Sequence, residues 1–176
     1  VWELTLRCDH ACGHCGSRAG KARHDELSTD EALRVVSELA ALGAREVTLI
    51  GGEAYLRDDW TAIARAITDA GMRCSMTTGG RGLSLERARQ AKEAGVRSIS
   101  VSMDGLAPAH DTLRGLEGSH AAALAAMRAI REVGIELSAN TQVNRLALPD
   151  LEALVDLFAS EGVRAWQVQL TVPMGR

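Results

Sequence analysis

Short apolar runs alternate along this chain with longer segments in which apolar residues recur every three or four positions. The first pattern is typical of buried β-strands and the second of amphipathic helices. Several helical segments are followed by a glycine, such as Gly43 or Gly71, which suits a left-handed C-cap. The pattern predicts six strands, at 2–6, 46–50, 73–77, 98–102, 136–143 and 165–170, separated by five helices near 29–42, 59–70, 84–94, 119–133 and 151–161.

This alternation predicts an α/β fold with parallel strands and right-handed crossovers, either a partial barrel or an open doubly wound sheet. Ligands of such folds bind at the carboxyl ends of the strands. All six predicted ends carry cysteines, glycines or polar residues, which implies one shared site around a common axis. We therefore expect a partial (β/α)6 TIM-like barrel.

Composition narrows the class of protein further. The chain has 176 residues, 46% of them apolar, and a net charge of −3, which suits one well-buried domain and excludes intrinsic disorder. Its charge-free stretches are shorter than the roughly 18 apolar residues of a membrane span, and its start is not that of a signal peptide. The mild acidity and the few aromatic residues argue against nucleic-acid binding. We expect a cytoplasmic protein with neither membrane nor nucleic-acid partners. Because the chain lacks an initiator methionine and stops just after a predicted strand, we also expect it to be part of a longer protein.

The loop after the first predicted strand contains Cys8, Cys12 and Cys15 in a C-x3-C-x2-C pattern. These cysteines are too crowded to pair sensibly as disulfides and instead suit metal binding in a reducing compartment. Three thiolates can ligate three irons of a [4Fe–4S] cube and leave the fourth iron open for a small molecule. Cys74 lies outside this spacing and is expected in the core. The alternative is a structural zinc site with a histidine as fourth ligand, namely His10, His14 or His24.

The cysteine pattern resembles the signature of the radical S-adenosylmethionine (SAM) superfamily, which follows the first strand of a partial (β/α)6 barrel. The resemblance implies that Cys8, Cys12 and Cys15 are both the metal ligands and the catalytic residues. It further implies that the open iron chelates SAM and that an electron from the cluster breaks the sulfur–carbon bond. The resulting 5′-deoxyadenosyl radical would then abstract hydrogen from a substrate.

The segment Gly51-Gly52-Glu53 resembles the G-G-E-P element of the same superfamily, with Ala54 where proline is usual. By this resemblance the two glycines let the backbone approach SAM, and Glu53 receives the ammonium group of SAM. A Gly-Gly-Glu sequence after a strand is also a common helix entry.

Later strand ends are expected to complete the SAM site. Thr77 begins a T-T-G-G segment where relatives have a T-N-G element facing SAM, so Gly79 takes the place of an asparagine. By resemblance, Ser102 and the planar guanidinium of Arg114 hold the SAM carboxylate. The alternatives are a surface salt bridge of Arg114 with Asp111 or Glu117, and an N-cap role for Ser119.

The last two predicted strands are expected to contact the nucleoside of SAM. Asn140 or Thr141 would bond the ribose, while Gln169 and Leu170 would offer backbone or an apolar face to the adenine. The alternation of Asn140, Gln142 and Asn144 places these side chains on one face of a strand, without indicating which face lies inside.

Several details most resemble the subfamily whose barrel precedes a Cys-rich SPASM or twitch domain. They are Gly51-Gly52-Glu53, Ser102-x-Asp104-Gly105, His110-Asp111 and the terminal Pro173-x-Gly175-Arg176. Residues 1–176 are therefore interpreted as a radical SAM core domain. A SPASM or twitch domain is expected outside this chain, because only Cys74 is left over for auxiliary clusters.

The resemblance implies a peptide maturase-like enzyme that uses a [4Fe–4S] cluster and SAM to modify a ribosomal peptide or protein side chain. The electron donor would be a protein such as flavodoxin or ferredoxin. One alternative is a radical SAM enzyme that modifies a tetrapyrrole or another cofactor. Another is a zinc-binding β/α module with no catalytic activity.

Overall fold

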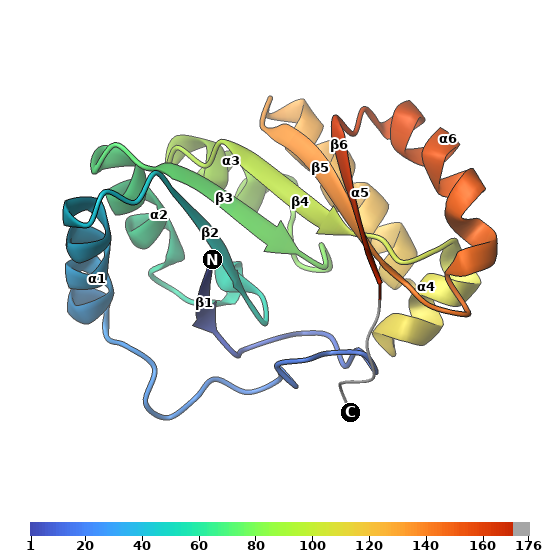
Figure 1. Cartoon of the computed structure of the whole chain (residues 1–176), viewed down its shortest axis with the longest axis horizontal. Helices are drawn as coiled ribbons and strands as arrows, with labels where there is room; N and C mark the ends of the chain where they lie inside the picture. Colours follow the sequence, from blue (N-terminus) through green and yellow to red (C-terminus); the bar gives the residue numbers. More distant parts are fainter. Residues whose placement is uncertain (171–176) are drawn as a thin grey trace.

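A single parallel sheet forms the centre of the computed structural model, which describes residues 1–170 (Figure 1). Its strands follow the chain in the order β1-β2-β3-β4-β5-β6, and each neighbouring pair is parallel. The strands are β1 (Trp2–Thr5), β2 (Glu46–Gly51), β3 (Arg73–Thr78), β4 (Ser98–Ser102), β5 (Glu136–Val143) and β6 (Ala165–Leu170). All six predicted strands are confirmed to within a residue at each end. The predicted feature at Pro173, Gly175 and Arg176 lies outside the described residues.

The strand order never reverses, so every right-handed crossover places its helix on the same side of the sheet. This arrangement is that of a partial (β/α)6 barrel, whereas a doubly wound sheet reverses its order and has helices on both faces. The α-helices are α1 (Thr29–Ala41), α2 (Trp60–Asp69), α3 (Leu85–Glu93), α4 (Ala107–Arg114), α5 (Ser119–Glu132) and α6 (Leu151–Glu161). Short 3-10 turns lie at η1 (Ala54–Leu56) and η2 (Leu148–Asp150).

The periodicity did not predict helix α4. Proline at its start and a left-handed C-cap at Gly115 define its ends. However, its buried residues are His110 and Arg114, both of them polar, so the helix carries no apolar stripe. Helices α1 and α3, in contrast, begin at serine N-caps that the sequence shows, Ser28 and Ser84.

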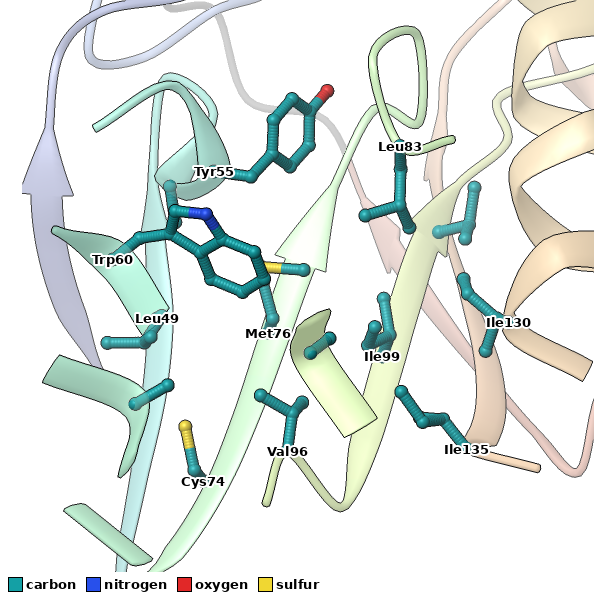
Figure 2. Close-up of a cluster of buried hydrophobic side chains, with 14 of the residues drawn as sticks. Leu49, Tyr55, Trp60, Cys74, Met76, Leu83, Val96, Ile99, Ile130 and Ile135 are labelled. Atoms are coloured by element: carbon teal, nitrogen blue, oxygen red, sulfur yellow. The ribbon is translucent and has the colours of Figure 1, made fainter. Parts of the chain in front are cut away.

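The hydrophobic core lies between the sheet and the helices that cover it (Figure 2). Alternate residues of the four inner strands, β2 to β5, enter this core, for example Ile99 and Val101 of β4. Cys74 is fully buried there, close to Leu49 and Met76, as expected. Apolar side chains therefore fix the helix-covered face of the sheet and leave its other face for polar groups.

The face that the helices leave uncovered carries mainly uncharged polar side chains, with the Glu46–Arg73 ion pair at its amino-terminal edge. Thr48 and Ser75 are hydrogen-bonded at 2.9 Å, and the Asn140 amide donates to Ser100 at 3.3 Å. The Gln142 amide donates to Gln169 at 2.6 Å. Asn140 and Gln142 thus lie on the uncovered face, which their alternation alone had not indicated.

Among residues 1–170, none of the helices has the length and apolar character of a membrane span.

Candidate active site

A long loop between β1 and α1 carries the three cysteines across the carboxyl ends of the strands (Figure 1). The loop is tied to itself, because the Cys8 N–H donates to the Gly20 carbonyl at 2.9 Å. At its far side the Gly13 N–H donates to the carbonyl of Leu113 in α4 at 3.1 Å. This cluster loop, residues 6–28, is therefore held at both β1 and α4.

A cavity of about 230 Å³ lies between the cluster loop and the strand ends. His10, His14, Ala19, Ile50, Thr78 and Gly79 form part of its wall. The other lining residues are all predicted site residues: Cys8, Cys12, Cys15, Gly51, Gly52, Glu53, Thr77, Ser102 and Arg114. Residues from three strand ends, helix α4 and the cluster loop thus meet at one place.

Each of the three thiols accepts one hydrogen bond from the surrounding protein. The His10 N–H contacts Cys8 Sγ at 3.4 Å, and the Ala19 N–H contacts Cys15 Sγ at 3.4 Å. The Arg114 guanidinium donates to Cys12 Sγ at 3.8 Å. Three soft sulfur donors with N–H partners, facing one cavity, fit an iron–sulfur cluster with three protein ligands, whose potential such bonds help to set.

Burial changes the pKa of two of these thiols, Cys8 and Cys12. It raises the pKa of Cys8 to about 11 and also raises that of Cys12 above its ordinary value. Without a metal these groups are neutral thiols at pH 7, so metal binding must displace their protons.

The histidines proposed as zinc ligands have different surroundings: His10 and His14 line the cavity, whereas His24 does not. His24 is exposed in its side chain, whereas His14 Nε2 lies 3.4 Å from Asp104 Oδ2. His10 Nδ1 lies 3.0 Å from Asp9 Oδ1, and the ligand atoms of Cys8, Asp9, His10 and Glu53 fall within 4.8 Å of one another. A metal ion bound through His10 would therefore have carboxylate ligands available besides the cysteine.

Gly51 and Gly52 allow the end of β2 to approach the start of the cluster loop. A Cβ on Gly51 would lie 2.1 Å from the Thr5 carbonyl oxygen, and one on Gly52 would lie 2.1 Å from that of Arg7. This close approach forms two hydrogen bonds, from the Gly52 N–H to Thr5 O and from the Glu53 N–H to Arg7 O, both 2.8 Å. The chain itself thus accounts for the two glycines, while their contact with SAM stays a prediction.

Glu53 is buried at the cavity wall, and the end of β3 holds its carboxylate. The Thr78 hydroxyl donates to Oε2 at 2.5 Å and the Gly79 N–H donates to Oε1 at 2.7 Å. Burial raises the pKa of the Glu53 carboxyl, and these two bonds act in the opposite direction. The carboxylate is fixed in direction, and each oxygen keeps a lone pair for a further donor.

Arg114 is buried and pairs with Asp104, not with Asp111 or Glu117 as the alternative interpretation proposed. Its Nη2 lies 2.6 Å from Asp104 Oδ2, and Asp104 has no exposed surface. Asp104 Oδ1 accepts the Gln142 N–H at 2.9 Å. Asp111 instead accepts backbone N–H groups of Gly118 and His120. Arg114 is therefore a buried cation beside Cys12 with its own counter-ion.

Replacing Asp104 with asparagine should destabilise the fold by about 3–5 kcal/mol, because it leaves the buried guanidinium of Arg114 without a counter-charge. The oxygen of the new amide could still accept the Gln142 N–H. Urea unfolding of the metal-free protein measures the effect. Asp156→Asn on the exposed side of α6 is the control. Equal stabilities of the two variants would contradict the ion pair.

Asn140 and Leu170, predicted to contact the nucleoside, do not line the cavity. Asn140 lies on the uncovered face of the sheet, and Leu170 is 83% exposed at the end of β6. The predicted ribose contact of Thr141 is corrected, because this residue is buried on the helix-covered face. Its hydroxyl donates to the Met103 carbonyl at 2.6 Å and accepts from Trp166 Nε1 at 2.9 Å, so it does not face a ligand at the uncovered side.

Several residues at or beside the cavity have no role predicted from the sequence. Thr78 has none although it adjoins Thr77, and Asp104 enters only as part of a subfamily pattern. Ser119 is interpreted from the sequence as an N-cap, but the N-cap of α5 is Gly118 and the Ser119 hydroxyl is buried between two histidines. The signal available in the sequence was the group of histidines and charged residues between Asp104 and His120.

Comparison with known proteins agrees with this geometry. The family model described as the radical SAM superfamily matches residues 2–161. An AdoMet-dependent heme synthase from Methanosarcina barkeri is 37% identical over 178 residues, covering 100% of this chain and 51% of the relative. A PqqA peptide cyclase from Ruegeria pomeroyi is 35% identical over 170 residues, covering 94% of this chain and 45% of the relative.

Among solved structures, Streptococcus suis SuiB bound to S-adenosylmethionine has a similar fold. The TM-score is 0.84 at 16% identity, over 97% of this chain and 40% of that chain. The match confirms the partial (β/α)6 barrel. The chain spans about half the length of the curated relatives it matches.

The family match covers nearly the whole chain and includes the cysteine loop and the strand ends that surround the cavity. The same match decides against the alternative interpretation, a zinc-binding module with no catalytic activity. The predicted resemblance to the superfamily and to its peptide-modifying members is confirmed, as are its cofactors, a [4Fe–4S] cluster and SAM. The chain belongs to the radical SAM superfamily.

Proposed function

We propose that this chain forms the core of an enzyme that cleaves SAM reductively and uses the resulting radical to abstract hydrogen from a substrate. The observation that carries this proposal is the convergence of Cys8, Cys12 and Cys15 with Glu53 and Arg114 on one cavity at the carboxyl ends of the strands. When bound, the cluster supplies the electron that breaks the sulfur–carbon bond of SAM.

Protein groups around the cavity have distinct tasks in this proposal. Cys8, Cys12 and Cys15 hold the cluster, and the buried Glu53 carboxylate offers its remaining lone pairs to the SAM ammonium. Ser102 and Arg114 donate hydrogen bonds to the SAM carboxylate. Arg114 can do so while paired with Asp104, because its Nε–H is buried without a hydrogen-bond partner among the residues that the structure describes. Thr77 lines the same wall and is proposed as a further SAM contact.

We expect Glu53→Gln to weaken SAM binding about ten- to a hundredfold, since a charge-assisted hydrogen bond contributes roughly 1.5–3 kcal/mol. The amide also replaces one acceptor oxygen with a donor, opposite either the Thr78 hydroxyl or the Gly79 N–H. Calorimetric titration of cluster-loaded protein with SAM measures the dissociation constant.

Glu152→Gln, in the exposed first turn of α6, is the matched control. Both variants should retain their iron, because neither residue is a cluster ligand in this proposal. An unchanged dissociation constant for Glu53→Gln would remove Glu53 from the SAM site.

For the substrate, we propose an iron tetrapyrrole with carboxylate side chains. The support is the similarity of the whole chain to an AdoMet-dependent heme synthase at 37% identity. A peptide is the second candidate, supported by the 35% identity with a PqqA peptide cyclase. The uncharged hydroxyl and amide groups on the uncovered face, such as Ser100, Asn140 and Gln142, can hydrogen-bond peptide groups and are the specific support for this second class.

Anaerobic assay of the cluster-loaded protein tests both the cleavage of SAM and the class of substrate. With a strong reductant we expect slow release of 5′-deoxyadenosine, and its absence from fully loaded protein would contradict SAM cleavage. Faster release with an iron coproporphyrin than with a peptide library supports the tetrapyrrole, and the reverse order supports the peptide. We further propose a cytoplasmic enzyme that receives electrons from flavodoxin or ferredoxin.

A further inference from the structure

Two buried histidines and a serine link the cluster loop to helices α4 and α5. The Ser119 hydroxyl lies 3.3 Å from His10 Nε2 and 3.2 Å from His110 Nε2. All three residues are buried, and Ser119 and His110 have no exposed surface. Because Ser119 and His110 have no contact with bulk water, their hydrogen bonds must be satisfied within the protein.

The direction of this network follows from one backbone group. The Asp104 N–H, which can only donate, lies 3.0 Å from His110 Nδ1. His110 Nδ1 must therefore be unprotonated, and a neutral ring then carries its proton on Nε2. Burial favours this neutral form, because it lowers the pKa of His110 to about 3. The His110 Nε2–H thus donates to the Ser119 hydroxyl.

The remaining steps follow from donor and acceptor capacity. Having accepted from His110, the Ser119 hydroxyl can donate its own proton to His10 Nε2. At the other side of the ring, His10 Nδ1 lies 3.0 Å from Asp9 Oδ1, a carboxylate oxygen that can only accept. The order of hydrogen bonds is Asp104 N–H to His110, His110 to Ser119, and Ser119 to His10. The His10 Nδ1–H then faces the Asp9 carboxylate.

Packing confines the His10 ring as well. A Cβ built on Gly79 would lie 2.8 Å from His10 Cε1, so the ring occupies the space of a side chain at position 79. This contact, together with Glu53 Oε1 at 3.0 Å from the same Cβ, accounts for glycine at position 79. His10 is thereby fixed by a hydrogen bond at Nε2, a carboxylate at Nδ1 and a strand end against its edge.

We propose that His10, Ser119 and His110 are positioning residues. They hold the part of the cluster loop between Cys8 and Cys12 at a fixed position relative to the Asp104–Arg114 pair. His10 stands midway between these two cysteines in the sequence, and its own N–H contacts Cys8 Sγ. We call the hydrogen bonds that join Asp104, His110, Ser119 and His10 the relay. Asp104 connects its other end, because the Asp104 N–H starts the relay while the Asp104 carboxylate holds Arg114. The purpose assigned to the relay rests on the proposed function, whereas the tests below use metal-free protein and no SAM.

The first test is long-range 1H–15N NMR of histidine-labelled, metal-free protein near pH 7.5. We expect His110 to carry its proton on Nε2 and His10 to carry its proton on Nδ1, each as a single tautomer. His24, exposed in its side chain, should show the mixture of an unrestrained ring. A proton on His110 Nδ1 or on His10 Nε2 would overturn the relay. The tautomers are measured in the unsubstituted protein, and variants serve only to assign the signals.

The second test compares alkylation of individual cysteines in the metal-free protein by mass spectrometry. Ser119→Ala should speed alkylation of Cys8 and Cys12 about fivefold or more, because the loop opens locally when its anchor loses two hydrogen bonds. Cys74 in the core should stay protected. Ser160→Ala is the matched control, since its exposed hydroxyl bonds only within α6.

Each result of the alkylation test decides the proposal independently of SAM cleavage. Selective acceleration at Cys8 and Cys12 supports a positioning role. Equal acceleration at all four cysteines would show a general loss of stability, and unchanged rates would show that the loop is held without the relay. Either of these outcomes overturns the proposal, even if the protein cleaves SAM.

Discussion

Alanine at position 8, 12 or 15 should abolish assembly of a stable [4Fe–4S] cluster, whereas alanine at position 74 should leave it intact. Loss of one thiolate exposes a second iron of the cube, and the cluster becomes labile. Cys74 cannot substitute, because it is fully buried among core side chains on the helix-covered face. We expect each of the three ligand variants to lose nearly all of its iron after anaerobic reconstitution.

Iron, sulfide and visible absorbance per protein measure this expectation. Cys74→Ala serves as the matched control, with a modest loss of stability of about 1 kcal/mol from the small cavity it leaves. Retention of iron by Cys12→Ala together with its loss from Cys74→Ala would refute the ligand assignment.

The strands and the position of the site were predictable because both depend on local patterns. Short β-like runs of five to eight residues and the glycines after the helices set the element boundaries. Parallel topology then brings all strand ends to one edge, so the order of the motifs along the chain is enough to place Cys8, Glu53 and Ser102 near one another. The cavity confirms that these side chains meet.

Contacts made across the fold were not predictable. Arg114 has two acidic neighbours nearby in the sequence, yet it pairs with Asp104, because α4 turns its polar side chains toward the cavity. Hydrophobic periodicity cannot detect a helix whose buried residues are His110 and Arg114. Such a segment has the sequence pattern of a loop.

The orientation of β5 also required the structure. Period-two alternation separated Asn140 from Thr141, but either set could have faced the ligand side. The helices decided between them, since they cover the face where Thr141 bonds Met103 and Trp166. The predicted ribose contact therefore remains a prediction for Asn140 alone.

Gly52→Ala should destabilise the protein by about 3 kcal/mol or more, at the upper end of the range for single substitutions. The new Cβ would lie 2.1 Å from the Arg7 carbonyl oxygen and 2.8 Å from Cys8 Cβ, so the cluster loop must move away. That movement breaks the bond from the Glu53 N–H to Arg7 O and displaces Cys8 from the cavity. We expect a lower melting temperature of the metal-free protein and little iron after reconstitution.

Gly13→Ala provides a control within the same loop. A Cβ on Gly13 meets no atom within 4 Å, and its backbone does not adopt a positive φ. We expect this variant to stay within about 0.5 kcal/mol of the parent protein and to bind its cluster normally. The contrast isolates the contact between β2 and the cluster loop, because both variants add one methyl group near a cysteine. If Gly52→Ala matched Gly13→Ala in melting temperature and iron content, close approach of these backbones would not be what requires glycine at position 52.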